Sequence, residues 1–113
     1  MSYNISKELF EAVMKCKINN YGFGTSNIGI RVVTEMFDEI LITYNDFFFK
    51  CKEWALEQGY ILESSFKDTS ICVVYRIIND GWSKTKETSF SRSSEQQAVF
   101  DACMYILNNK DRQ

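Results

Sequence analysis

Apolar residues recur every three or four positions in three segments of the chain, and this spacing predicts three amphipathic helices. Each segment begins with a hydroxyl side chain that can accept a hydrogen bond from the first helical turn, namely Ser6, Thr43 and the Ser93–Ser94 pair. The first helix should end near Lys17. Gly59 should end the second, because glycine readily adopts the left-handed conformation found after helices.

Four further segments are rich in β-branched and other apolar residues, which are typical of strands, and a fifth, whose middle has no large apolar residue, should be an exposed or edge strand. The predicted strands are 27–34, 36–42, 60–65, 71–78 and 82–90. The first two should form a hairpin. The last three should pair in antiparallel fashion, because turn residues separate them.

Two glycine-containing segments are predicted to be turns. Residues 19–24 contain two glycines and two asparagines, which permit positive φ and stop a helix, so a turn or loop is expected there. A phosphate-binding loop is not expected at Gly22 and Gly24, because such a loop follows a strand and precedes a helix, the reverse of the order here. The Asn-Asp-Gly sequence at 79–81 should close a hairpin.

Together these elements predict an α+β fold for a single domain of residues 1–113. An antiparallel sheet, made of the three C-terminal strands plus the N-terminal hairpin, should be packed by two or three helices. The composition is 45% hydrophobic, enough apolar surface for a folded core in a chain of this length. Helices on one face of an antiparallel sheet leave the other face or an edge available to a partner.

The sequence contains no apolar run of about 18 residues, so no membrane-spanning helix is expected. The N-terminal segment, residues 1–10, lacks the basic and then apolar pattern of a secretory signal. The protein is therefore expected to be cytoplasmic, with no membrane partner.

The chain contains no histidine, which removes the commonest general base and metal ligand and makes Ser-His-Asp and Cys-His catalytic arrangements impossible. Its four cysteines are far apart in sequence and are expected to be reduced core thiols. Five acidic residues are candidates for a catalytic carboxylate pair, but they are expected to be charged surface. They are Asp38, Glu39, Glu53, Glu57 and Glu63. We therefore expect a non-enzymatic protein with no cofactor and no metal.

The densest aromatic feature lies at the start of the second predicted helix. Three consecutive phenylalanines at 47–49 span roughly 200° of a helix, so one of them should be exposed or pack under another element. Burial is the alternative to a protein-binding role for this cluster, and both stay open. The candidate protein-binding residues are Tyr44, Phe47, Phe49, Glu53 and Glu57.

The last predicted hairpin offers an alternative function. Its residues Trp82, Lys84 and Lys86, with Arg92 nearby, combine an aromatic ring with basic groups, as nucleic-acid-binding surfaces do. Against this, the formal net charge is −2, and exposed strands often carry lysine simply to prevent edge pairing. Direct nucleic-acid binding is therefore the less favoured prediction.

From Tyr44 to Leu107 the predicted order of helix, three antiparallel strands and helix resembles the double-stranded-RNA-binding domain. In that family the last helix opens with a basic cluster that grips phosphates. Here residues 93–97 read Ser-Ser-Glu-Gln-Gln, so the resemblance does not carry the RNA-binding function to this chain.

The sequences Lys-Cys-Lys-Glu-Trp-Ala at 50–55 and Ala-Val-Phe-Asp-Ala-Cys at 98–103 are similar to those of small uncharacterised proteins encoded by bacteriophages and prophages. This resemblance implies a phage accessory protein that acts in the bacterial cytoplasm. Such proteins often occupy a surface of a host complex, including CRISPR effectors. The expected partner is a host protein or nucleoprotein complex, the expected role is inhibition of the anti-CRISPR type, and a homodimer is a further option.

Overall fold

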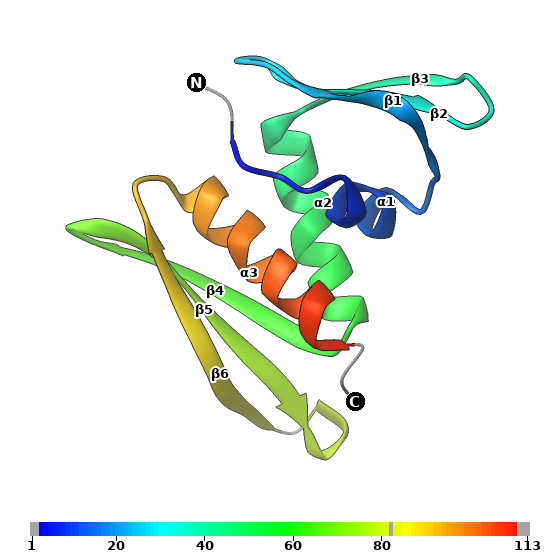
Figure 1. The fold of residues 1–113 in the computed structure, drawn as a ribbon. Coiled ribbons are helices and arrows are strands. Elements are labelled where there is room, and N and C mark those ends of the chain that lie inside the picture. Colours follow the sequence, from blue (N-terminus) through cyan, green and yellow to red (C-terminus); the bar gives the residue numbers. More distant parts are fainter. Residues whose placement is uncertain (1–2, 82, 111–113) are drawn as a thin grey trace.

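Three α-helices lie between two antiparallel sheets in the computed structural model, which describes residues 3–81 and 83–110 (Figure 1). The helices are α1 (Lys7–Met14), α2 (Tyr44–Glu57) and α3 (Glu95–Lys110). The predicted α+β class is confirmed. The N-terminal hairpin, however, belongs to a sheet of its own instead of extending the C-terminal one.

Each sheet has three strands in sequential order, and all neighbours are antiparallel. The N-terminal sheet consists of β1 (Ile18–Thr25), β2 (Gly29–Thr34) and β3 (Glu39–Thr43). The C-terminal sheet consists of β4 (Tyr60–Lys67), β5 (Thr69–Ile78) and β6 (Ser83–Arg92), and the short 3₁₀ turn η1 (Asn79–Gly81) joins its last two strands. The hairpin predicted from the Asn-Asp-Gly sequence is therefore present.

The loop predicted for residues 19–24 is wrong, because these residues form most of β1. Glycine is tolerated inside a strand where another backbone approaches closely. A Cβ at Gly22 would lie 2.4 Å from the carbonyl oxygen of Val33 on the neighbouring strand. The pairing register also shifts between Ile18 and Phe23, as expected for a bulge.

The helix caps follow the sequence pattern. The side-chain oxygens of Ser6, Thr43 and Ser94 accept hydrogen bonds of 3.1–3.2 Å from the backbone N–H three residues further on. The first helix ends earlier than predicted, at Met14, because Lys15 adopts a left-handed conformation with φ +55°. Gly59, at φ +90°, lies just after α2 as expected.

Aromatic rings from all three helices meet in the middle of the core. Phe10 of α1 stacks on Phe47 of α2 with ring centroids 5.3 Å apart, and Phe47 contacts Phe100 of α3 at 5.6 Å. All three side chains are fully buried. The sheets cover this layer from both sides with the inward-facing residues of their central strands, including Val32 and Val74.

Because the helices occupy one face of each sheet, the other face of each sheet has no helix packed against it (Figure 1). Among the residues that the structure describes, none of the helices combines the length and the apolar character that a membrane span requires.

Replacing Gly22 by alanine should destabilise the fold by about 1–3 kcal/mol, because the new methyl group would overlap the Val33 carbonyl oxygen. Gly24 on the same strand is the matched control, since a Cβ there would meet nothing within 4 Å. Gly24→Ala should change the free energy of unfolding by no more than about 0.5 kcal/mol. Urea unfolding followed by circular dichroism measures both values, and equal effects would contradict the close approach at Gly22.

Candidate functional site

Large apolar side chains are exposed mainly on the N-terminal sheet. Eight of them are more than half exposed in the described part of the chain, and five of the eight belong to this sheet and its turns. These five are Tyr21 (97% exposed), Ile28 (76%), Met36 (81%), Phe37 (78%) and Leu41 (72%). Contiguous exposed apolar surface, rather than single apolar residues, is typical of sites that bind other molecules.

The register of β2 and β3 explains why Leu41 points outward. Ile30 pairs with Ile42 and Val32 pairs with Ile40 on the face toward the helices. The residues between them, Arg31, Val33, Glu39 and Leu41, therefore point to the opposite side. We call this side, together with Tyr21 of β1, the outer face of the N-terminal sheet.

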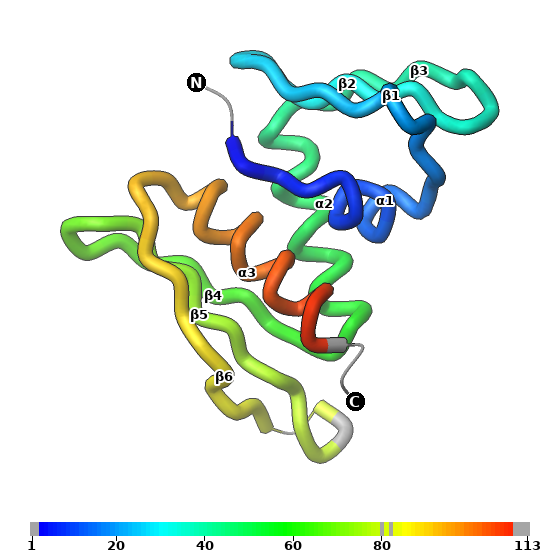
Figure 2. Tube along the Cα trace, in the orientation of Figure 1, coloured from blue at the N-terminus to red at the C-terminus, as the bar shows by residue number. Residues whose placement is uncertain are grey.

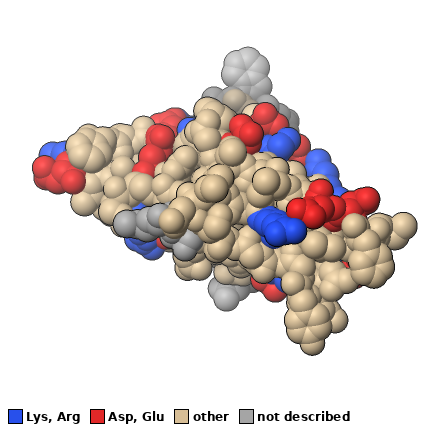
Figure 3. All heavy atoms as spheres, turned by 90° about the horizontal axis from the view of Figure 1, so that it is seen from above, with Lys and Arg blue, Asp and Glu red and all other residues tan. Residues whose placement is uncertain are grey.

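The outer face is shallow and carries little net charge. Arg31 and Glu39 form an ion pair of 3.0 Å at its centre, and both side chains are more than half exposed. Tyr21, Arg31 and Val33 contribute to the lining of a hollow of about 270 Å³. In Figure 3, which looks down on this sheet, uncharged atoms cover most of the surface and the charged groups are scattered.

Residues 35–38 join β2 to β3, and the hydrogen-bonded pair Thr34 and Asp38 encloses a three-residue turn with a well-defined backbone. The Phe37 N–H donates to the Thr34 carbonyl at 2.9 Å, and the Thr34 N–H donates to the Asp38 carbonyl at 2.9 Å. The Asp38 N–H in turn donates to the Thr34 hydroxyl at 3.1 Å. Phe37 has φ +64°, a left-handed conformation that costs a bulky residue about 1 kcal/mol or more.

The predicted protein-binding residues do not form one surface. Tyr44 and Phe47 are buried, because α2 directs them to the core, which is the burial alternative for these two members of the cluster. Tyr44 instead donates a hydrogen bond of 2.5 Å to the Ser26 carbonyl. Phe49 is the exposed member of the phenylalanine triplet, and Glu53 and Glu57 are exposed on the same helix.

The predicted nucleic-acid-binding residues are also divided. Lys84 and Lys86 share the outer face of the C-terminal sheet, where Lys84 lies over the ring of Tyr75 at 4.2 Å and forms an ion pair with Glu63. Arg92 pairs with Ser70 and so lies on the opposite face, toward the helices. Trp82 lies outside the described residues.

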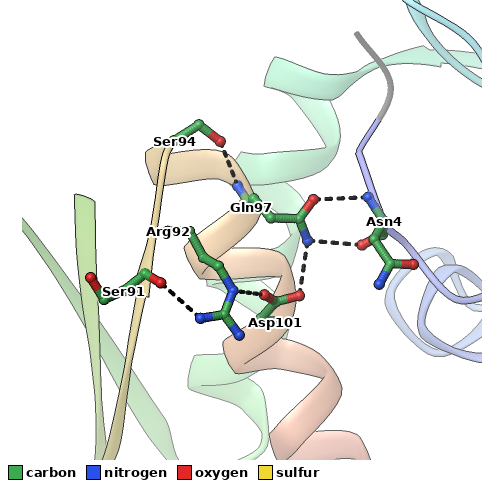
Figure 4. A network of polar contacts seen from close by, with 6 residues as sticks. All are labelled: Asn4, Ser91, Arg92, Ser94, Gln97 and Asp101. Atoms are coloured by element: carbon green, nitrogen blue, oxygen red, sulfur yellow. Dashed lines mark hydrogen bonds and ion pairs between the residues drawn. The ribbon is translucent and has the colours of Figure 1, made fainter. Parts of the chain in front are cut away.

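Arg92 belongs to a polar network beside a hollow of about 580 Å³ between β6 and α3. Its Nε lies 2.5 Å from Asp101, whose other oxygen accepts a hydrogen bond of 2.8 Å from Gln97 (Figure 4). The Gln97 amide also bonds the backbone of Asn4 through both its nitrogen and its oxygen, at 3.0 and 2.8 Å. This network therefore ties the N-terminal segment and β6 to α3.

Three of the four thiols are buried in the layer between α2, α3 and β5. Burial raises the pKa of the Cys72 thiol to about 12. Hydrogen bonding with Cys51 and burial both raise the pKa of Cys103, whose Sγ lies 3.6 Å from the Cys51 carbonyl oxygen. A raised thiol pKa is the opposite of what a nucleophilic cysteine needs at neutral pH.

Within residues 3–81 and 83–110, no three Cys, Asp or Glu side chains are grouped so that they could hold a metal ion. No protein-family model, no curated protein and no solved structure matches this chain.

Sequence reasoning missed the outer face of the N-terminal sheet for two reasons. Tyr21 lay in the segment predicted to be a loop, and the apolar run 40–42 does not show by itself which residue faces the core. The available signal was Leu41, because it is the middle residue of this run, and strand geometry points it away from Ile40 and Ile42, which are partly buried and buried, respectively.

The buried thiols should stay unreactive when the pH is raised. In a Cys16→Ser variant, which keeps the three buried thiols, Ellman's reagent should react slowly at pH 7 and at pH 9. An ordinary thiol would react roughly twenty times faster at pH 9, whereas Cys72 with a pKa of about 12 remains almost fully protonated. All three should react at once in denaturant. One fast equivalent in the native protein would show that a thiol is accessible and activated.

Proposed function

We propose that this chain is a non-catalytic binding protein that docks on a partner protein through the outer face of the N-terminal sheet. The observation that carries the proposal is the concentration of exposed apolar side chains on this sheet and its turns. Aromatic residues and methionine, here Tyr21, Phe37 and Met36, are enriched in protein interfaces, while Lys, Glu and Asp are depleted from them.

The balance of charge supports a protein over a nucleic acid as the partner at this surface. A nucleic acid is attracted by clustered cations, and the one cation at the centre of the outer face, Arg31, is paired with Glu39. On the C-terminal sheet, the ion pair between Lys84 and Glu63 likewise reduces the positive charge that the lysines present. Nucleic-acid binding through the last hairpin therefore stays the second prediction.

The biological setting of the proposal comes from the resemblance to phage-encoded proteins. In that setting the partner is a bacterial host protein or nucleoprotein complex, and occupation of its surface inhibits it, as an anti-CRISPR protein inhibits a CRISPR effector. Inhibition by occupation needs no catalytic group, so it agrees with a chain that has no histidine.

Replacing Leu41 by aspartate should weaken partner binding at least tenfold without reducing stability, because Leu41 is 72% exposed at the centre of the proposed interface. The matched control is Leu56→Asp, since Leu56 is 58% exposed on α2. The tagged protein is used to isolate its partner from bacterial lysate. Biolayer interferometry with the purified partner then compares wild type, Leu41→Asp and Leu56→Asp.

Two results would contradict the proposal. One is that no stoichiometric protein partner is recovered at moderate or high salt. The other is that Leu41→Asp and Leu56→Asp bind the partner equally well. Gel-shift titration with single- and double-stranded probes at low salt tests the alternative, in which Lys84→Ala and Lys86→Ala should weaken binding.

A further inference from the structure

The β2–β3 turn holds a phenylalanine where its backbone conformation favours glycine. Three-residue hairpin turns commonly end in a left-handed residue, and glycine or asparagine normally occupies it. Four non-glycine residues in the described part have positive φ, namely Lys15, Phe37, Asp68 and Asn79. Phe37 is the aromatic member of this group, and it gains little in return from burial, because it is 78% exposed.

Because Phe37 has both a strained backbone conformation and an exposed side chain, it does not contribute to stability as a buried phenylalanine does. A buried phenylalanine would offset backbone strain with apolar burial, but an exposed one does not. Three hydrogen bonds between Thr34, Phe37 and Asp38 hold the turn in place regardless of the side chain at position 37. The ring is therefore presented to solvent on a backbone that is already ordered, and preorganisation of this kind reduces the entropy cost of binding.

The neighbours of this ring define the chemistry of its partner. Met36, also 81% exposed, adjoins Phe37, and the acidic residues Glu35 and Asp38 flank the pair in sequence. Lys17 is the basic residue beside the turn, where its carbonyl accepts a hydrogen bond from the Glu35 N–H. In Figure 3, uncharged side chains project beyond a group of acidic ones at the right-hand end, where this turn lies.

We infer that the β2–β3 turn is the anchor of the docking surface, and that it inserts Phe37 and Met36 into an apolar pocket on the partner protein. Basic side chains border this pocket, opposite Glu35 and Asp38. The inference rests on the proposed function, because it assigns the partner's chemistry to one end of the same surface.

The first experiment replaces Phe37 by asparagine, which tolerates the left-handed conformation without a side-chain ring. The urea midpoint of Phe37→Asn should rise or stay unchanged, while affinity for the isolated partner should fall at least tenfold. Phe66→Asn is the matched control, because Phe66 is 75% exposed near the end of β4, beside the β4–β5 turn. These two turns lie at opposite sides of the molecule (Figure 2). Phe66→Asn should leave affinity unchanged.

The second experiment places the photo-crosslinking residue p-benzoylphenylalanine at position 37, and in a separate protein at position 66. Irradiation in bacterial lysate should give a discrete protein adduct from position 37 and not from position 66. Mass spectrometry of the adduct should locate the crosslink among apolar residues with Lys or Arg beside them. Replacing both Glu35 and Asp38 by their amides should weaken affinity, and should do so less at high salt.

The outcomes separate this inference from the proposed function. If Leu41→Asp abolishes binding and Phe37→Asn does not, the sheet binds the partner but its turn is not the anchor. A crosslink that lands on an acidic or wholly polar surface overturns the assignment of partner chemistry. If Phe37→Asn loses stability as well as affinity, the ring supports the fold and the inference fails.

Discussion

The contact among Phe10, Phe47 and Phe100 is the constraint on which the rest of this structure depends. Each helix contributes one ring, and all three rings are fully buried. Both sheets pack on this helical layer, one on each side of it. The core of this small chain therefore lies between two sheets, whereas other folds bury one sheet between two layers of helices. The same arrangement leaves one face of each sheet without a helix over it, so the two exposed sheet faces follow from how the core is built.

The two exposed faces differ in their side chains. The N-terminal sheet presents strongly exposed large apolar groups. The C-terminal sheet presents two lysines on β6, and one of them forms an ion pair with a glutamate of β4.

The elements that could be predicted from the sequence are those that depend on the preferences of a few neighbouring residues. The caps at Ser6 and Thr43, the glycine after α2 and the turn at 79–81 depend on the conformational preferences of one to four residues. The strand β1 was not predictable in this way. Its two glycines have high intrinsic freedom, and at Gly22 the strand is compatible with the close approach of the Val33 backbone, a contact made only after β2 has paired. Tertiary contact here outweighs local preference.

The candidate surface was less predictable than the fold, for a related reason. The aromatic cluster at 44–49 was a candidate for protein binding because its residues are large and close in sequence. Helical geometry, however, directs Tyr44 and Phe47 into the core. The five residues that are exposed instead lie on two strands, β1 and β3, and in the two turns of the N-terminal sheet, so they belong to one unit only once the sheet has formed. Arg92 shows the converse case. It is the last residue of β6, the strand that carries both lysines, and strict alternation would place it on the same face as Lys84 and Lys86. The register shift between the Thr88 and Lys86 pairs instead places Arg92 on the other face, beside Asp101. In each case, exposure depends on which side of an element faces the helices.

Thr43 has two structural roles at once, since it is the last residue of β3 and the cap of α2. Strand and helix therefore meet with no linker between them, and the next buried side chain along the chain, Tyr44, is bonded back to the β1–β2 turn through Ser26. The linker-free join and this hydrogen bond restrain rotation of the N-terminal sheet about the helices. A molecule held on the N-terminal sheet would therefore have a restricted orientation relative to the C-terminal sheet. The protein would then act as a spacer, with one side held and the opposite side directed outward.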